Sequence, residues 1–327
     1  MKNLAIIGGG SWGTALALAL ARRFERISLW VYEADLAERM RESRVNDVYL
    51  TGFELPKHIR VTSVLREALD GAGIVLTVVP SHLVRGLFEQ MRPHLQDSML
   101  LVSATKGIEN NTLLRMSQII GQNGGPVAVL SGPSFAKEVA CGEPTALVAA
   151  SEDQTTAEAV QSAFYGPALR VYTSTDPTGV EIGGSIKNVI AIGAGVLHGL
   201  GLGHNAMAAL ITRGLAEMTR LAIAMGGNRP TLAGLAGLGD LVLTCTGELS
   251  RNRMVGVELA RGKTLDEITG SMKMVAEGVK TTAAAVGLAK RYSVEMPIVQ
   301  QMSEVLQGIT APREAIQHLM ERPLRNE

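Results

Sequence analysis

The sequence is poor in cysteine and has no excess of charge of either sign, and both absences exclude classes of protein. Its 327 residues include two cysteines, Cys141 and Cys245. Their separation of about a hundred positions suits neither a disulfide framework nor a pair of metal ligands, and we expect a reducing compartment, the cytoplasm. Lys and Arg total 31, as do Asp and Glu, so the formal net charge is zero. With no basic run as well, we expect no nucleic-acid partner.

The sequence also lacks the signatures of several other classes. Its six histidines show no zinc-site spacing, and no Gly-x-Ser-x-Gly elbow suggests a hydrolase. Residues 3–21 carry no charge, but Gly8-Gly9-Gly10-Ser11 interrupts them. The apolar pieces on either side are shorter than the roughly 20 residues that a membrane-spanning helix needs. We therefore expect neither a signal peptide nor a membrane span.

Glycine is abundant, with 36 residues, and 46% of the chain is apolar. A chain of this length predicts about two domains with cores of their own. In the first half, short apolar runs alternate with helical patterns, which predicts parallel βαβ units. The runs expected as strands are residues 4–7, 27–32, 61–62, 74–79, 99–102, 127–130, 146–149 and 169–172, with helices over 14–23 and 34–44.

After about residue 178 only helical patterns remain. Apolar residues recur at spacings of three and four over 205–225, and further helices are expected over 275–290, 296–306 and 312–320. The methionines in these patterns are interpreted as core residues. The expected fold is therefore α/β: a Rossmann-like, doubly wound, mainly parallel sheet over residues 1–178, followed by an all-α domain over 179–327.

A glycine motif points to a dinucleotide. Gly8-x-Gly10-x-x-Gly13 follows the first expected strand and opens a helix, and Glu33 stands at the end of the second strand. The glycines permit a tight turn, close approach of a pyrophosphate and close packing of helix on strand, while the acid suits a ribose 2′-hydroxyl. An alternative for Glu33 is a solvated acid at a helix start.

Two lysines are candidates for chemistry. Lys106 lies in a loop after an expected strand, and Lys187 lies among apolar residues such as Ile186 and Val189. Partial desolvation would lower the pKa of such a lysine and suit it to acid–base work. The alternative is a surface lysine whose stem alone is buried. Asp240, an acid among apolar and glycine residues, is expected to have a partner.

Ser250-Arg251-Asn252 precedes a helical pattern and could bind an anion through donor side chains and free backbone N–H groups. The alternative is an ordinary serine N-cap with an exposed arginine.

Together the motifs resemble those of bacterial NAD(P)-dependent glycerol-3-phosphate dehydrogenase. The resemblance is carried by Gly8 to Ala15, Ser103 to Gly107, Ser131 to Ala136, Lys187-Asn188, Ala236 to Leu241 and Ser250 to Asn252. These six motifs stand in the order of the family and extend over nearly the whole chain.

The resemblance implies roles for individual residues. Lys187 would be the proton acceptor, and Asp240 would orient it or the substrate. The implied substrate-binding residues are Lys106, Gly132, Ser134, Lys187, Asp240, Ser250, Arg251 and Asn252. The implied or motif-based cofactor-binding residues are Gly8, Gly10, Ser11, Trp12, Gly13, Glu33, Tyr49, Lys106, Ala136, Arg251, Val275 and Glu277. No metal is expected.

The implied reaction is hydride transfer between NAD or NADP and C2 of sn-glycerol 3-phosphate or dihydroxyacetone phosphate, a small phosphorylated triose. The resemblance also implies reduction as the physiological direction, a supply of glycerol 3-phosphate for phospholipids, and a homodimer. Many members have a basic residue or histidine where this chain has Tyr32-Glu33, so we expect NADH to serve at least as well as NADPH. Arg39 or Arg41 is the basic residue that could otherwise meet a 2′-phosphate.

Two other functions remain open from the sequence. One is a lysine-using β-hydroxyacid dehydrogenase of the 6-phosphogluconate type, whose substrate would carry a carboxylate. The other is a non-catalytic nucleotide sensor, for which Lys187 and Asp240 would have no use.

Overall fold

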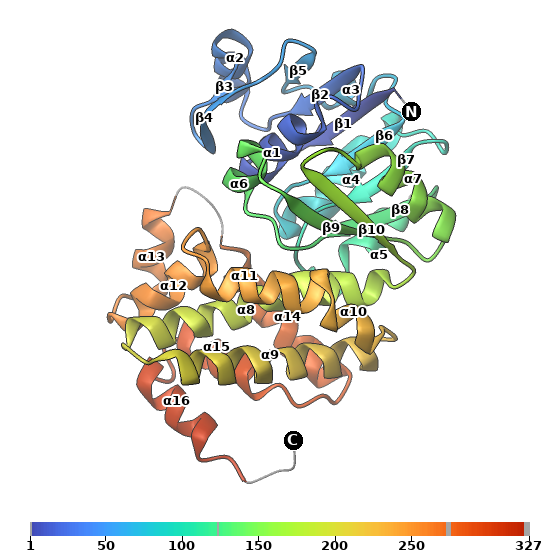
Figure 1. The fold of residues 1–327 in the computed structure, drawn as a ribbon. Helices are drawn as coiled ribbons and strands as arrows, with labels where there is room; N and C mark the ends of the chain where they lie inside the picture. Colours follow the sequence, from blue (N-terminus) through green and yellow to red (C-terminus); the bar gives the residue numbers. More distant parts are fainter. Residues whose placement is uncertain (1, 123, 273–275, 324–327) are drawn as a thin grey trace. The chain divides into compact units, whose positions relative to one another are not determined.

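The computed structural model describes residues 2–122, 124–272 and 276–323. The chain forms two compact units (Figure 1). The first comprises residues up to Lys106 together with Leu114–Glu181, and the second comprises Gly107–Leu113 together with the chain from Ile182 onward. Residue 178, where the sequence suggested a boundary, lies inside one continuous helix, α8 (Pro177–Gly199).

The first unit is built on an eight-stranded sheet with the order β10-β9-β8-β7-β6-β1-β2-β5. In the register of its centre, Leu4 of β1 pairs with Ile27 of β2 and with Ile74 of β6. All neighbours run parallel except β8 and β9, which confirms the mainly parallel sheet. The strands are β1 (Asn3–Ile7), β2 (Arg26–Trp30), β5 (Ile59–Thr62), β6 (Ile74–Thr77), β7 (Leu100–Ser103), β8 (Val127–Ser131), β9 (Thr145–Ala150) and β10 (Leu169–Ser174).

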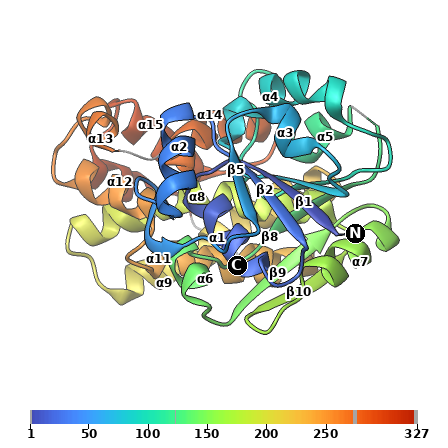
Figure 2. The same cartoon turned by 90° about the horizontal axis from the view of Figure 1, so that it is seen from above.

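Helices cover both faces of this sheet, because its central strands are apolar on both sides. Leu4 and Ile6 pack in one core with Leu16 of α1, whereas Ala5 and Ile7 pack in the opposite core, which α3, α4 and α5 complete. The view from above shows α3, α4 and α5 together on one side (Figure 2). The helices are α1 (Ser11–Leu20), α2 (Ala34–Ser43), α3 (Leu65–Leu69), α4 (Val84–Met91), α5 (Met116–Gly121), α6 (Ala136–Cys141) and α7 (Gln154–Phe164), with short 3-10 turns at Ser81–Leu83 and Arg92–His94.

The first unit differs from the expectation in two places. The helix expected over residues 14–23 occupies Ser11–Leu20, because the extended backbone of Gly10 already serves as its N-cap. A small antiparallel hairpin, β3 (Val45–Asn46) and β4 (Leu50–Glu54), was not expected. Most residues of β4 are exposed or half-buried, so this strand has no apolar run that a sequence could signal.

From Ile182 onward, the described residues of the second unit form helices joined by loops and no strand, which confirms the all-α expectation. Its helices are the rest of α8, then α9 (His204–Ala224), α10 (Arg229–Ala233), the π-helix η3 (Leu235–Gly239), α11 (Asp240–Thr246), α12 (Arg251–Ala260), α13 (Leu265–Ser271), α14 (Glu277–Arg291), α15 (Pro297–Leu306) and α16 (Pro312–Met320). The expected helices over 205–225, 296–306 and 312–320 each agree to within one residue.

Helix α8 forms the centre of the helical core. Ile182, Ile186, Val189 and Ile190 are fully buried in it. With a mean hydropathy of 1.4, α8 is the one helix among the described residues that is long and apolar enough to cross a membrane. Its apolar window is entirely buried inside the structure, as in the core helix of a globular protein.

Candidate active site

The glycine motif forms the turn between β1 and α1. Gly8 has a φ of +128°, and a Cβ there would lie 2.6 Å from the carbonyl oxygen of Val78. A Cβ on Gly13 would overlap the carbonyl oxygen of Gly8. The first and third glycines are therefore required by the backbone, the first for the turn and the third for close packing of helix on strand.

The second glycine and its neighbours leave room and donors for a ligand. A Cβ on Gly10 would meet nothing within 4 Å, and Ser11 is the first residue of α1. The indole N–H of Trp12 is buried without a hydrogen-bond partner in the structure. Trp12 and Ala136 pack on the same small cluster around Ala15. Open space beside Gly10 at the start of a helix fits the pyrophosphate of a dinucleotide.

Glu33 is half-buried rather than freely solvated. It is the N-cap residue of α2, yet its side chain accepts no hydrogen bond from that helix. Instead its Oε1 accepts a hydrogen bond of 2.7 Å from the hydroxyl of Tyr49. This hydrogen bond to a carboxylate, together with burial, raises the pKa of Tyr49 to about 12. The structure thus brings two expected cofactor residues into direct contact.

The basic residues of α2 are disposed differently. The guanidinium of Arg39 binds Asp35 at 2.9 Å and Asp47 at 3.0 Å. Arg41 is exposed two positions along the helix, on the opposite side. Arg39, one of the two basic residues that could meet a 2′-phosphate, is therefore already held by two carboxylates.

Three expected substrate residues lie together at the carboxyl ends of β7 and β8. Lys106 Nζ donates to the carbonyl oxygen of Gly132 at 3.0 Å, and Ser134 Oγ donates to the same oxygen at 2.9 Å. Open α/β sheets bind their ligands at this edge.

In the second unit, Lys187 and Asp240 form a buried ion pair. Lys187 Nζ lies 2.5 Å from Asp240 Oδ1, and the two residues are 5% and 1% exposed. Lys187 Nζ also donates to Thr244 Oγ1 at 2.8 Å, and that hydroxyl donates to the Asp240 carbonyl oxygen at 2.7 Å. The alternative of a surface lysine is therefore wrong, and Asp240 has the partner that the sequence required.

Close backbone packing sets the distance between these residues. A Cβ on Gly183 of α8 would overlap the carbonyl oxygen of Ala236 in η3. Asp240 immediately follows η3. Helix α8 can therefore approach the start of α11 only because position 183 carries no side chain.

The Ser250-Arg251-Asn252 segment opens α12. Ser250 is its N-cap, with Oγ accepting from the Arg253 N–H at 3.2 Å. Arg251 is half-buried. Burial lowers the pKa of its guanidinium, while the charge of Glu277 raises it. Because an arginine begins far above neutral pH, it remains a cation. The alternative of an N-cap serine is thus correct, but the arginine beside it is not an exposed one.

Asn252 belongs to a buried amide network. Its Nδ2 donates to Asn188 Oδ1 at 3.0 Å, and its Oδ1 accepts from the Gly278 N–H at 2.9 Å. This network joins the starts of α12 and α14 to the helix of Lys187. Val275, an expected cofactor residue, lies outside the described residues.

Three residues of these sites were missed by sequence reasoning. Thr244 lies four positions after Asp240 on a helix, a spacing that places both side chains on one face. Asn188 belongs to the Lys187-Asn188 motif, but that motif does not indicate its hydrogen bond with Asn252. Asn46 bonds the glycine turn from the unexpected hairpin, at 2.8 Å to the carbonyl oxygen of Gly9, and no sequence pattern signals it.

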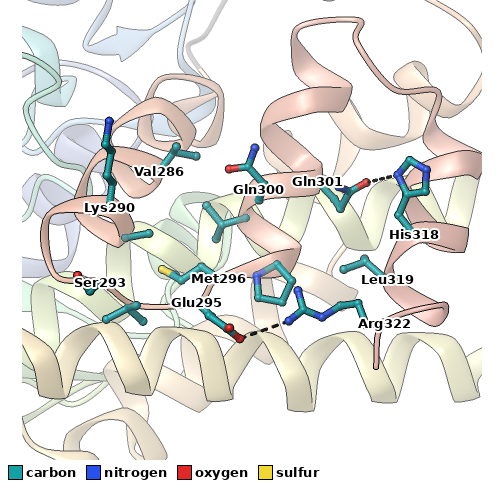
Figure 3. Close-up of a pocket in the computed structure, with 14 residues that line it drawn as sticks. Val286, Lys290, Ser293, Glu295, Met296, Gln300, Gln301, His318, Leu319 and Arg322 are labelled. Atoms are coloured by element: carbon teal, nitrogen blue, oxygen red, sulfur yellow. Dashed lines mark hydrogen bonds and ion pairs between the residues drawn. The ribbon is translucent and has the colours of Figure 1, made fainter. Parts of the chain in front are cut away.

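A cavity of about 570 Å³ also lies in the helical unit, lined by residues of α14, α15 and α16 and of the segments beside them (Figure 3). Its wall includes an ion pair of 3.4 Å between Glu295 and Arg322, and His318 lies 3.2 Å from Gln301. No expected site residue is among its lining residues.

The first unit thus has the turn, acid and donor set of a dinucleotide-binding domain, and the second buries a lysine that is paired with a carboxylate and a hydroxyl. This combination is typical of nicotinamide-dependent dehydrogenases.

Comparison with known proteins narrows this class to one family. Two family models, the NAD-dependent glycerol-3-phosphate dehydrogenase N-terminus and C-terminus, match residues 3–157 and 176–317. Because these matches cover most of the chain, it belongs to the NAD-dependent glycerol-3-phosphate dehydrogenase family.

Individual relatives agree over their full lengths. The chain is 54% identical to glycerol-3-phosphate dehydrogenase (NAD(P)+) of Koribacter versatilis, covering 100% of this chain and 99% of the relative. It is 52% identical to the enzyme of the same name from Geobacter sulfurreducens, with the same coverage. The crystal structure of glycerol-3-phosphate dehydrogenase from Coxiella burnetii superposes with a TM-score of 0.94 at 40% identity, covering 98% of this chain and 99% of that one.

These findings confirm the family that the motifs indicated and an oxidoreductase that uses NAD or NADP. They do not favour the alternative of a β-hydroxyacid dehydrogenase.

Proposed function

We propose that the chain interconverts sn-glycerol 3-phosphate and dihydroxyacetone phosphate, with Lys187 as its acid–base group. The observation that carries this proposal is the buried contact of 2.5 Å between Lys187 and Asp240. When bound, the nicotinamide accepts or delivers the hydride at C2. Neutral Lys187 Nζ takes the proton of the C2 hydroxyl during oxidation and becomes an ammonium. In reduction the ammonium returns that proton to the carbonyl oxygen.

Asp240 and Thr244 hold Lys187 in this mechanism. The carboxylate stabilises the ammonium form, and the Thr244 hydroxyl can accept from Nζ while donating to the Asp240 carbonyl oxygen. The lysine is thereby confined to one rotamer, so that its proton is presented in one direction.

Phosphate binding is assigned to Ser250, Arg251 and Asn252 at the start of α12, because a half-buried guanidinium at a helix N-terminus suits a dianion. Lys106, Gly132 and Ser134 are proposed as further substrate residues. Gly8, Gly10, Ser11, Trp12, Gly13, Glu33, Tyr49 and Ala136 would hold the dinucleotide, with Lys106, Arg251, Val275 and Glu277 as additional contacts. Glu33 disfavours a 2′-phosphate, and NADH is therefore proposed to serve at least as well as NADPH.

The physiological setting is part of the same proposal. We infer a cytoplasmic homodimer that works in the direction of reduction and supplies glycerol 3-phosphate for phospholipid synthesis. These points rest on the resemblance to the family.

Absorbance at the nicotinamide band, after NADH is mixed with dihydroxyacetone phosphate, tests the reaction directly. An Arg251→Ala variant then tests the phosphate site. Because a hydrogen bond to a charged group contributes about 1.5–3 kcal/mol, the KM for dihydroxyacetone phosphate should rise about 10- to 100-fold.

The KM for dihydroxyacetone, which lacks the phosphate, should rise far less on the same substitution. Arg261 lies at the other end of α12, where its side chain is exposed. Arg261→Ala should change the KM of neither substrate. Equal losses for both substrates would show that Arg251 holds structure or cofactor instead. An absence of NADH oxidation by the wild-type protein would contradict the proposed reaction itself.

A further inference from the structure

The hairpin β3–β4 lies beside α2 in the first unit (Figure 1). Its side chains contact the glycine turn, Glu33 and Arg39 of α2. Its turn residues, Asp47 to Tyr49, follow Asn46 and precede Leu50. Neither strand belongs to the main sheet. A two-stranded hairpin is marginally stable by itself, so its position depends on what its side chains bind.

Asn46 attaches this hairpin to the glycine turn. Its side chain is fully buried, and Nδ2 donates to the carbonyl oxygen of Gly9 at 2.8 Å and to Thr14 Oγ1 at 2.9 Å. Its Oδ1 accepts from the backbone N–H of Tyr49 at 2.9 Å. One amide group therefore connects the turn that would meet the pyrophosphate with the turn that presents Tyr49.

Tyr49 in turn orients Glu33. An N-cap carboxylate ordinarily accepts hydrogen bonds from its own helix, but that of Glu33 does not. The Tyr49 hydroxyl occupies Oε1 at 2.7 Å, which leaves Oε2 as the oxygen available to a ribose hydroxyl. Glu33 ends the connection after β2, the place where a dinucleotide fold reads the 2′ position.

Asp47, two residues before Tyr49, holds the positively charged guanidinium of Arg39. Its two oxygens accept from Arg39 Nε at 3.0 Å and from Arg39 Nη2 at 3.4 Å, in a forked geometry. Asp35 in the first turn of α2 accepts from Nη1 of the same guanidinium at 2.9 Å. Two carboxylates thus neutralise the charge of Arg39. The 2′-phosphate of a bound NADPH would have to compete with both of them for the guanidinium.

We propose that the β3–β4 hairpin is the cofactor-specificity element of this enzyme: Tyr49 presents the Glu33 carboxylate to the ribose diol, while Asp47 withholds Arg39 from a 2′-phosphate. The inference rests on the proposed preference for NADH and names the residues that set it. Both contacts act in the same direction, since one favours a hydroxyl and the other removes a partner for phosphate.

The test measures equilibrium binding of NADH and NADPH to the full-length protein, with nicotinamide fluorescence as the readout. The competitors are 5′-ADP and adenosine 2′,5′-bisphosphate. Tyr49→Phe removes the hydroxyl and keeps the ring. Because it releases a carboxylate that would make a charge-assisted hydrogen bond, the Kd for NADH should rise about three- to tenfold, with a smaller change for NADPH. Asp47→Asn should lower the Kd for NADPH and for adenosine 2′,5′-bisphosphate about three- to tenfold, because Arg39 loses one of its two carboxylates.

Matched controls lie in the same unit, away from the hairpin. Tyr172→Phe changes a half-exposed tyrosine on β10, and Asp97→Asn removes one exposed negative charge. Both should leave the ratio of the two dissociation constants unchanged. A melting curve on each variant separates a loss of binding from a loss of fold.

Three results decide between the possibilities. If Tyr49→Phe and Asp47→Asn each change the ratio of the NADH and NADPH dissociation constants less than twofold, the hairpin does not set specificity. If Tyr49→Phe weakens both dinucleotides equally, Tyr49 binds a part common to them and the assignment to the ribose is wrong. A wild-type protein that binds NADPH tenfold more tightly would contradict the proposed preference for NADH, whereas the shifts in the variants would still report on the hairpin.

Discussion

Lys187 shows how the environment of one side chain determines what it can do. Its ammonium lies among the apolar residues of α8 and contacts Asp240 and Thr244. A buried ion pair contributes little net stability, but removal of one partner leaves an uncompensated charge. The pair is therefore costly to break, and the ammonium of Lys187 is held in one place by two partners.

Replacement of this lysine should separate catalysis from stability. Lys187→Met keeps most of the unbranched side chain and removes the charge, and it should lower kcat by about 10²- to 10⁴-fold, the usual contribution of a positioned proton carrier. It should also lower the free energy of unfolding by about 3–5 kcal/mol, because Asp240 is left unpaired. The Kd of NADH should change little, since the glycine turn belongs to the first unit.

Two further proteins make the measurement decisive. Lys187→Met combined with Asp240→Asn should regain stability without regaining activity, because no buried charge remains unpaired. Lys290→Ala removes an exposed lysine on α14 and should behave as wild type. A folded Lys187→Met protein that retained more than a tenth of the wild-type kcat would exclude Lys187 from the mechanism.

At the scale of elements, small residues decide how closely helices approach. Gly195 of α8 and Gly256 of α12 lie against each other's helix backbone, where no Cβ would fit. Gly183 does the same against the π-helix η3. A π-helix has wider turns than an α-helix and occurs frequently at functional sites. The π-helix η3 ends directly before Asp240.

Gly183→Ala should therefore impair catalysis without touching a reacting group. The added methyl would push η3 from α8, and a displacement of about 1 Å of a catalytic pair can cost a factor on the order of 10² in kcat. Gly193→Ala on the same helix is the matched control. Its Cβ would meet Met302 Sδ at an ordinary 3.4 Å, and alanine should be tolerated or slightly stabilising there. Equal kcat values for the two variants would argue against a positioning role for Gly183.

A buried carboxylate joins two other helices. Glu217 of α9 is 1% exposed, and its oxygens accept from the backbone N–H groups of Ile298 and Val299, at 2.7 and 3.2 Å, in the first turn of α15. Burial raises the pKa of this carboxyl to about 7, against the opposing effect of these two hydrogen bonds. The folded state therefore holds the Glu217 proton more tightly than the unfolded chain.

The sign of the resulting pH dependence follows. Glu217 contributes its full stabilisation below about pH 4.5 and loses it as the pH rises through about 7, a difference on the order of 3 kcal/mol. Glu217→Gln cannot titrate, so the difference in unfolding free energy between wild type and variant should vary across this range and level off above it. Urea titrations at several pH values measure that difference. A constant difference from pH 4.5 to 8 would contradict the raised pKa.

At the scale of the whole molecule, each unit has a core of its own. The two cysteines lie in different units and differ in their exposure to solvent. Cys141 is exposed at the end of α6, whereas Cys245 is buried in the helical core. Burial raises the pKa of the Cys245 thiol to about 12. Its thiolate, the reactive form, is therefore scarce at neutral pH.

The native protein should consequently react with a thiol reagent at one cysteine, and the denatured protein at both. The rate of labelling at Cys245 should be limited by the opening of the helical unit. Mass spectrometry of the labelled peptides distinguishes the two sites, and Cys141→Ser provides a protein in which only the buried thiol remains. Fast labelling of Cys245 in that native variant would show that the helical core opens more readily than its burial implies.

Much of this organisation is determined by the sequence itself. The alternation of apolar runs with helical patterns predicted the parallel sheet, because strands buried on both faces must be apolar along their length. The sequence also predicted the glycine turn with Glu33 and the apolar surroundings of Lys187, because both patterns consist of residues that are close in the sequence. For residues such as Arg251, the local pattern allowed either an anion site or an exposed arginine beside an N-cap, and the family motifs implied a specific role.

Only the tertiary structure decided which side chains meet. The hairpin β3–β4 has little apolar signal, and its contacts join residues that are 8 to 37 positions apart, such as Asp47 with Arg39 and Asn46 with Gly9. The contact of Lys187 with Asp240 extends over 53 positions and depends on the absence of a side chain at Gly183. Such pairings are set by how helices and strands pack in three dimensions, because hydrogen bonds of buried groups form between neighbours in space and leave no period in the sequence.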